Sequence, residues 1–201
     1  MKKITITQIS EKKIKAGNPL LQMEDFPNEL SFDEGELVEL VDSRQKFVAK
    51  AYLAKQNKGV GWVFSLDNAD SFNEAFFKKQ FEKAKRKRTD LQSDPETTTY
   101  RLFNAEGDGI PGVTIDHYDG FAVVSWYSEG IFRYQTAIIA AFQAVFPETK
   151  GIYEKFRYQR KDSLISRFVT GEAAPTPLIV KENGINYATY LDDGLMTGIF
   201  L

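Results

Sequence analysis

The spacing of apolar residues changes near residue 70, and this change constrains the fold more than any other feature of the sequence. Before it, short apolar runs alternate with polar residues at the two-residue period of a strand, and turn residues separate the runs. Several short strands at this spacing predict a small β-barrel. The expected strands are the alternating Ile4, Ile6 and Ile9, residues 36–41 and 47–53 around a polar turn, and residues 62–64 after the chain breaks at Gly59 and Gly61.

A helical period follows directly. Ser71 and Glu74 have the spacing of a capping box, which marks the beginning of a helix. Phe77, Phe81 and Ala84 then fall on one face of that helix. We expect this helix to link the barrel to a second domain.

Strand and helix signals alternate between about residues 99 and 170, which predicts an α+β domain. The strand signals are residues 100–103, 113–115, 121–126 and 152–153, and the helix signal runs from Tyr134 to Val145, ending near Pro147. Asn183 and Gly184 then separate two short apolar runs, which is the pattern of a β-hairpin. The expected fold class is therefore α+β, with a barrel in residues 1–70, a small mixed α/β domain in 71–177, and a hairpin with an entry strand in 178–201.

The composition excludes several classes of site. The 201 residues contain no cysteine and one histidine, His117, so they hold no disulfide, no cysteine nucleophile and no multi-histidine metal site. No apolar run approaches the roughly 18–20 residues that cross a bilayer, and the first residues lack the pattern of a signal peptide. We therefore expect a cytoplasmic protein with no membrane partner.

The net charge of −2 disfavours a free-standing nucleic-acid module, so any RNA contact must depend on local basic patches. One patch interleaves Lys155, Arg157, Arg160 and Lys161 with two aromatic residues, a combination that suits single-stranded RNA. If the patch is a strand, its side chains alternate between two faces, and only some of them can contact one RNA. A sheet edge exposed to solvent would explain the basic residues equally well.

Two further patches carry weaker signals. Arg86 and Arg88 lie in the run of cations that ends the predicted helix, where they oppose the helix dipole whether or not they bind phosphate. Lys13 and Lys15 precede Gly17, which opens a Gly-x-Pro turn.

The segment from Asn104 to Gly112 contains three glycines and a proline, which predict a tight, irregular turn. It lacks the lysine and the Ser/Thr of a P-loop. Glu106, Asp108 and Asp116 offer carboxylates for a hydrolase or a magnesium site, but acidic loop residues are usually solvated. An acid–base hydrolase is therefore disfavoured.

Taken in order, five segments resemble the RlmI-type (YccW-like) large-subunit rRNA cytosine-C5 methyltransferases. KKIKAGNPLL at 12–21 and GELVELVDSRQKFVAKAYLAKQ at 35–56 resemble the PUA domain of the family, although Gly17-Asn18-Pro19-Leu20 replaces its usual Gly-His-Pro-aromatic turn. RLFNAEGDGIPGVTID at 101–116 is similar to the central-domain signature, and IYEKFRYQRK at 152–161 stands where the family has a basic segment. ENGINYATYLDDGLMTGIFL at 182–201 resembles the hairpin and strand that lead into the methyltransferase domain.

The resemblance implies an RNA-binding PUA domain, a central α+β domain, and a Rossmann-like domain that binds S-adenosylmethionine and carries a catalytic cysteine. The chain is then expected to stop before that last domain, to contain no catalytic residue and to bind no S-adenosylmethionine alone, although Phe200 would border the cofactor site. The expected partner is the 23S rRNA of the large subunit. An exposed hairpin leaves a homodimer open.

The first hypothesis is that this chain positions rRNA for methyl transfer by a catalytic domain that it does not contain. The residues expected to contact the RNA are Lys13, Lys15, Gly17, Arg86, Arg88, Arg157, Arg160 and Lys161. The alternative is a stand-alone, non-catalytic interaction or RNA-binding domain, because basic residues at these positions are also explained by solvation alone.

Overall fold

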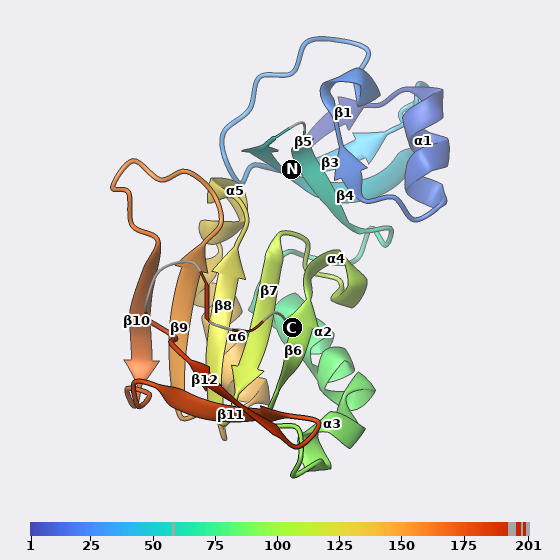
Figure 1. Ribbon diagram of the computed structural model, residues 1–201. Coiled ribbons are helices and arrows are strands. Elements are labelled where there is room, and N and C mark those ends of the chain that lie inside the picture. Colours follow the sequence, from blue (N-terminus) through green and yellow to red (C-terminus); the bar gives the residue numbers. More distant parts are fainter. Residues whose placement is uncertain (58, 193–195, 198, 200–201) are drawn as a thin grey trace.

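The chain forms two five-stranded sheets and a C-terminal hairpin (Figure 1). The computed structural model describes all residues except 58, 193–195, 198 and 200–201. The predicted α+β fold class is confirmed, with PUA-like strands first, a mixed α/β region second and the hairpin last. The predicted division of the chain at residues 70 and 177 stays a prediction.

The N-terminal sheet contains the strands predicted around the first turn and after Gly61. In spatial order the strands are β1 (Lys2–Thr5), β3 (Leu37–Val41), β4 (Phe47–Gln56), β5 (Gly59–Ser65) and β2 (Leu20–Leu21). β1 lies parallel to β3, and the other pairs are antiparallel. No pairing joins β1 to β2 in the described part of the chain, so the sheet is open where a closed barrel was expected.

The prediction was wrong at Ile9, which does not continue the first strand. Residues Gln8–Lys15 form helix α1, and the Thr7 side chain caps it by accepting a hydrogen bond from the Ser10 amide at 3.2 Å. Ile9 is 80% exposed on the outer side of this helix, whereas Ile14 is buried beneath it. The prediction placed Ile9 on the strand although it lies three residues after Ile6, a spacing that departs from the two-residue alternation of Ile4 and Ile6. A short 3₁₀ turn, η1 (Met23–Asp25), follows β2.

Two other local predictions also need correction. Gly59 and Gly61 do not break the chain but lie inside β5, where a Cβ atom at Gly61 would lie only 2.7 Å from the Tyr52 carbonyl oxygen on β4. The helix predicted after Ser71 exists, but Asn73 caps it, accepting from the Phe76 amide at 3.1 Å. The glycines therefore permit close strand approach, and the observed cap lies two residues after the predicted one.

The central sheet contains every strand predicted between residues 99 and 170. In spatial order its strands are β10 (Ser166–Gly171), β9 (Gly151–Phe156), β8 (Phe121–Trp126), β7 (Val113–Tyr118) and β6 (Thr99–Asn104). Helices α2 (Glu74–Lys87) and α6 (Gln135–Val145) pack together against one face. The predicted apolar faces are confirmed, since Phe77, Phe81 and Phe142 are fully buried there. The shorter helices are α3 (Thr89–Ser93), α4 (Ala105–Asp108) and α5 (Glu129–Phe132).

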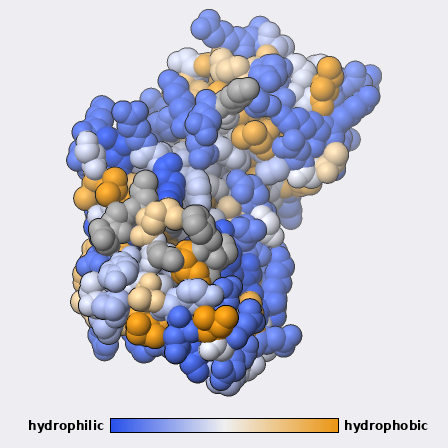
Figure 2. Space-filling model, in the orientation of Figure 1, coloured by the Kyte–Doolittle hydropathy of each residue, from blue (hydrophilic) through white to orange (hydrophobic). Residues whose placement is uncertain are grey.

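The other face of the central sheet is divided into an apolar part and a polar part. The predicted hairpin, β11 (Leu178–Glu182) and β12 (Ile185–Thr189), covers the apolar part, where Leu178 and Val180 pack on Tyr118 and Tyr153. Its outer side leaves Ile179 and Ile185 exposed, and apolar patches are visible over the hairpin in Figure 2. The hairpin therefore leaves the polar part of this face to form a separate site.

A continuous aromatic core joins the two sheets. Tyr52 and Trp62 of the N-terminal sheet share one buried cluster with Phe72 and Phe77, which border the central sheet. The Tyr52 hydroxyl donates to the Pro111 carbonyl oxygen at 3.0 Å, so a polar contact also crosses the junction. The two sheets consequently hold a fixed relative position.

Candidate functional site

A cavity of about 300 Å³ opens on the polar part of the central sheet. It forms because successive side chains of a strand point to opposite faces, so β7, β8 and β9 each send a polar side chain to the same face of the sheet. Ser125 on β8 stands directly opposite Lys155 on β9, and Asp116 projects from β7 on the same side. The cavity is lined by Arg101, Asp116, Tyr118, Val123, Ser125, Tyr127, Lys155, Arg157, Met196, Thr197 and Ile199.

A buried ion pair forms one wall of this cavity. Arg101 Nε donates to Asp116 Oδ1, and Arg101 Nη2 donates to Oδ2 at 3.3 Å. Burial raises the pKa of Asp116, and the hydrogen bonds from Arg101 oppose that rise. Burial works in the opposite direction on Arg101, but the hydrogen bond to Asp116 and the attraction of its charge together outweigh burial and raise the pKa of the guanidinium. The guanidinium keeps its proton in a protein, so this wall of the cavity always carries the positive charge of Arg101.

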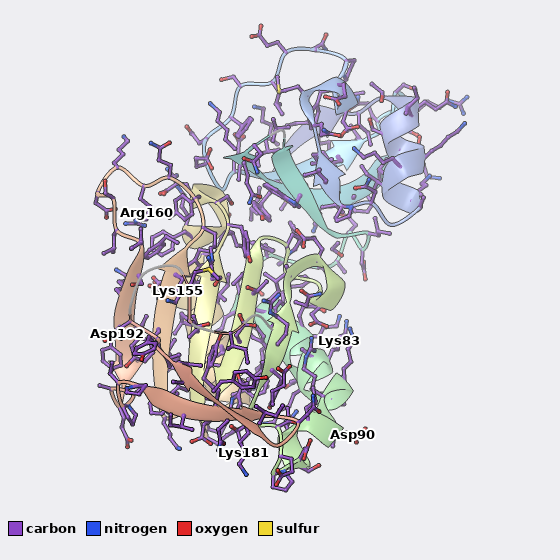
Figure 3. The ribbon with its side chains drawn as sticks, in the orientation of Figure 1. Lys83, Asp90, Lys155, Arg160, Lys181 and Asp192 are labelled. Atoms are coloured by element: carbon purple, nitrogen blue, oxygen red, sulfur yellow. The ribbon has the colours of Figure 1, made fainter. Side chains whose placement is uncertain are left out.

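Two further cations complete this cavity. Lys155 is fully buried and donates to the Met196 carbonyl oxygen at 3.4 Å, and Figure 3 shows it on the front of the sheet. Arg157 is the next residue to point to this face, beyond the end of β9, and its side chain is exposed at the rim. The cavity therefore has the Arg101–Asp116 pair in its wall and the exposed Arg157 at its rim.

Two larger cavities lie beside Arg157, at the junction of the two sheets. The first, of about 480 Å³, is lined by Glu34, Lys55, Gln56, Asn57, Glu129, Arg157, Tyr158 and Gln159. The second, of about 490 Å³, is lined by Glu34, Glu129, Phe132, Arg133, Gln159, Arg160, Lys161 and Asp162. We call these two cavities together with the cavity on the sheet the seam groove. Hydrophilic side chains cover this side of the molecule above the central sheet (Figure 2).

Three of the residues predicted to contact RNA line the seam groove. Arg157 and Lys161 are exposed there, whereas Arg160 is held in place by its surroundings. The Arg160 guanidinium carbon lies 4.3 Å from the Phe156 ring centroid, and its Nη2 lies 2.7 Å from Asp162 Oδ2. The hydrogen bond to Asp162 is the largest cause of a raised Arg160 pKa. Arg160 therefore organises the loop in which Figure 3 labels it.

The other predicted residues lie outside the seam groove. Lys13 and Lys15 are on α1 and pair with carboxylates, Lys13 with Asp25 at 3.1 Å and Lys15 with Glu11 at 2.5 Å. Gly17 follows that helix with φ 93°, as a left-handed turn residue. The remaining two are Arg86, exposed in the last turn of α2, and Arg88, which ends it.

Arg88 has a structural role that the sequence did not indicate. Its guanidinium donates to Asp108 Oδ2 at 2.7 Å and to the Arg101 carbonyl oxygen at 2.6 Å, and so anchors the glycine-rich segment to α2. The segment predicted as an irregular turn forms the short helix α4, and Gly109 continues from it with φ 94°. Asp108 therefore forms an ion pair with Arg88, while Asp116 lies in the separate cavity on the sheet.

Sequence reasoning missed Lys55, Arg101 and Arg133 as residues of the site. Lys55 lies near the end of β4 and Arg133 follows α5, so only the packing of the two sheets brings them together. Arg101 carried a signal, because it occupies a strand position of the same face as Asp116, which pairs with it in register. The sequence contains no comparable signal for Lys55 or Arg133.

The glycine-rich segment does not form an open nucleotide loop that S-adenosylmethionine could enter. The glycine-rich segment, the nearest resemblance to a nucleotide loop, is closed, because Cβ atoms at Gly109 and Gly112 would lie 3.0 Å from Gln80 Oε1 and 2.6 Å from the Tyr52 hydroxyl oxygen. Phe200, the residue expected beside the cofactor, lies outside the described residues. Among the residues that the structure does describe, no three His, Cys, Asp or Glu side chains cluster as metal ligands.

Comparisons with known proteins connect this arrangement to one group. A family model for the PUA-like domain matches residues 4–66. The candidate ribosomal RNA large subunit methyltransferase YwbD of Bacillus subtilis (strain 168) is 40% identical over 205 residues, which span 100% of this chain and 52% of the relative. The chain is a homologue of the large-subunit rRNA methyltransferases. Ribosomal RNA large subunit methyltransferase I of Escherichia coli O157:H7 is 30% identical over 171 residues, which span 83% of this chain and 43% of that protein.

Two solved structures of methyltransferases contain the fold of this whole chain. A candidate SAM-dependent methyltransferase from Streptococcus mutans superposes with a TM-score of 0.92 at 43% identity, covering 100% of this chain and 51% of that one. SMU.776, a candidate methyltransferase complexed with SAH, gives the same TM-score at 42% identity and covers 50% of its chain. The chain thus spans about half the length of the relatives that it matches. None of its described helices is long and apolar enough to cross a membrane.

Proposed function

We propose that this chain is the rRNA-binding half of an S-adenosylmethionine-dependent large-subunit rRNA methyltransferase. It holds 23S rRNA for methyl transfer to cytosine C5 by a catalytic domain outside these 201 residues. The observation that carries the proposal is the 40% identity, over the whole chain, to the large-subunit rRNA methyltransferase relative YwbD. The thiolate chemistry implied by the resemblance cannot come from this sequence, because it contains no cysteine.

The geometry supports a binding role in a protein whose net charge alone disfavours one. The seam groove gathers exposed cations at the junction between the PUA-like domain and the central sheet. Contacts from such cations to phosphate release counterions, so RNA affinity should fall linearly with salt on a double logarithmic scale. Binding of this kind fixes the register of the RNA without reading its sequence.

The test is fluorescence anisotropy of the chain with labelled fragments of 23S rRNA, at salt concentrations from about 50 to 200 mM. The proposal predicts binding that weakens steeply with salt. In parallel, the chain incubated with S-adenosylmethionine and rRNA should transfer no methyl group, and calorimetry should detect no cofactor binding. RNA affinity that is absent or independent of salt would contradict the proposal. Capture of a protein partner in place of RNA would favour a stand-alone interaction domain.

A homodimer is a further prediction, and it rests on the exposed hairpin. Ile179 and Ile185 leave apolar side chains on the outside of β11 and β12, where a second copy could cover them. Sedimentation equilibrium of the chain and of Ile179→Lys measures this directly, since a dimer through the hairpin should dissociate in the variant. The cytoplasmic location also stays a prediction.

A further inference from the structure

The three cavities of the seam groove are neighbours, because they share lining residues. The cavity on the central sheet shares Arg157 with the first junction cavity, and the two junction cavities share Glu34, Glu129 and Gln159. Their volumes of about 300, 480 and 490 Å³ lie in the range of pockets that hold a group of small-molecule size. A single ligand that occupies all three cavities is therefore an extended molecule with one small-molecule-sized unit in each cavity.

The lining of the seam groove is cationic although the chain is not. Seven basic and four acidic side chains line it, in a protein whose net charge is −2. Two of the basic side chains, Arg101 and Arg160, form ion pairs within the groove. Four others are exposed and form no ion pair with any residue in the described part of the chain: Lys55, Arg133, Arg157 and Lys161.

The acidic residues of the groove have local roles that account for their presence. Glu34 accepts the Lys55 backbone amide at 3.0 Å and so fixes the end of β4. Glu129 occupies the first turn of α5, where a negative charge stabilises the helix dipole. Asp116 and Asp162 are the partners of Arg101 and Arg160. The groove therefore presents a surplus of cations to a ligand.

Each cavity also contributes an aromatic ring that is half-buried. Tyr127 lines the cavity on the sheet, Tyr158 lines the first junction cavity, and Phe132 lines the second. The Arg160 guanidinium lies over two of these rings, 5.0 Å from the Phe132 centroid and 6.0 Å from the Tyr158 centroid, which leaves Tyr127 for a base. A half-buried ring beside exposed cations suits unpaired nucleotides, because a base stacks on the ring while phosphates meet the cations. Bases inside a duplex are already stacked on each other and cannot use such a ring.

The groove exists before any ligand binds. Tyr134 donates its hydroxyl proton to the Gly35 carbonyl oxygen at 2.6 Å, which ties the helical layer of the central sheet to the N-terminal sheet. Gly130 of α5 approaches so closely that a Cβ atom there would lie 3.0 Å from the Leu53 carbonyl oxygen. Because the two walls are fixed, little ordering entropy opposes binding.

We infer that a single-stranded segment of RNA lies along the seam groove, from Tyr127 on the central sheet past Arg157 to Arg133 at the PUA-like domain. The inference rests on the proposed function and names the surface that performs it. Lys55, Arg133, Arg157 and Lys161 contact phosphates, and Tyr127 stacks on a base. The cations of α1 and the end of α2 lie outside this path.

The experiment measures the affinity and the salt dependence of a labelled, unpaired 12-nucleotide RNA by anisotropy, with an RNA duplex of the same length as competitor. The variants are Arg133→Glu, Arg157→Glu, their combination and Tyr127→Leu. Lys78→Glu is the matched control, because Lys78 is exposed on α2, which covers the opposite face of the central sheet. Circular dichroism checks that each variant is folded.

Each charge reversal in the groove should weaken binding and lower the slope of log affinity against log salt by about 1 or more. Tyr127→Leu should weaken binding about 5- to 150-fold, the loss of one stacked base, and leave the salt slope unchanged. Lys78→Glu should behave as the parent chain. The duplex should compete poorly.

The outcomes separate this inference from the proposed function. If the parent chain binds rRNA but the groove variants and Lys78→Glu bind equally well, RNA lies elsewhere and only the inference is overturned. Effective competition by the duplex would overturn the single-stranded assignment. If the parent binds no RNA at all, or if groove variants release a protein partner instead, both the inference and the proposed function fail.

Discussion

Replacing Gly130 with alanine should destabilise the junction of the two sheets. The added Cβ atom would lie 3.0 Å from both the Gly35 backbone nitrogen and the Leu53 carbonyl oxygen, and closer still to the Ala54 Cβ atom. None of these three atoms can rotate away, since two are backbone and the third is bonded directly to it. Overpacking of this kind costs about 1–3 kcal/mol. Replacing a helical glycine otherwise gains about 0.4–1 kcal/mol, so the expected net loss is about 1–2 kcal/mol.

Urea denaturation followed by tryptophan fluorescence measures this loss in each sheet separately. The chain has two tryptophans, Trp62 in β5 and Trp126 in β8. The variants Trp62→Phe and Trp126→Phe therefore leave one probe in the central sheet and one in the N-terminal sheet. In the parent the two probes should report one transition, because a single core cluster contains both side chains. Gly130→Ala should lower the midpoint by about half a molar and move the two transitions apart.

Gly107→Ala is the matched control, because Gly107 also lies in a four-residue helix. Its Cβ atom would meet only the Asn104 side-chain nitrogen, at 3.3 Å, and that side chain can turn aside. The free energy of unfolding of this control should lie within about 0.5 kcal/mol of that of the parent, and its urea midpoint should be equal or slightly higher. The reasoning is refuted if Gly130→Ala unfolds at the parent midpoint, or if both alanine variants lose stability equally.

Three further predictions concern single side chains. Burial lowers the pKa of His117 to about 4, so the unfolded state takes up a proton first as the pH falls. The free energy of unfolding should decrease between about pH 6.5 and 4, by up to about 3 kcal/mol, and His117→Gln should flatten this dependence in urea titrations. Burial alone would raise the pKa of Asp108, but hydrogen bonds from Arg88 and Lys87 outweigh it and lower the pKa. The ionised Asp108 carboxylate therefore stabilises the folded state above its unfolded pKa, and this stabilisation is lost as the pH falls through its folded pKa. Asp108→Asn should lower the free energy of unfolding by about 1.5–3 kcal/mol at pH 7. The variant should also lose less structure on acidification, as measured by circular dichroism. Tyr52→Phe removes the hydroxyl that donates to the Pro111 carbonyl oxygen at 3.0 Å, and should lower the free energy of unfolding by about 1 kcal/mol in a thermal scan.

The sheets and the main helices could be predicted because burial follows hydrophobic period. The face of Phe77, Phe81 and Ala84 is buried as its spacing indicates, and the Asn183-Gly184 turn has positive φ at both residues. α1 could not be found in the same way. Its cap is one hydrogen bond, from the Ser10 amide to the Thr7 hydroxyl, while the alternation of Ile4 and Ile6 just before it indicates a strand and does not show where that strand ends.

The candidate site was predictable only where its residues are neighbours in sequence. Arg157, Arg160 and Lys161 stand together in the chain, so their clustering was visible. Lys55 and Arg133 join them through the packing of α5 against β4, which no local pattern encodes. Charge pairing is likewise a tertiary property, since Lys13 and Arg88 look like free cations until Asp25 and Asp108 are placed beside them.

The low net charge and the cationic groove are compatible because electrostatic attraction is local. At 0.1 M salt the Debye length is about 10 Å, so a phosphate in the groove responds to Lys55, Arg133 and Arg157 and hardly at all to the distant acidic surface. The remainder of the chain is net acidic, because the groove holds seven basic and four acidic side chains while the whole protein carries −2. Averaged over that surface, the charge disfavours RNA binding outside the groove. A charge balance that disfavours a general nucleic-acid binder therefore favours one in which RNA has a single place to lie.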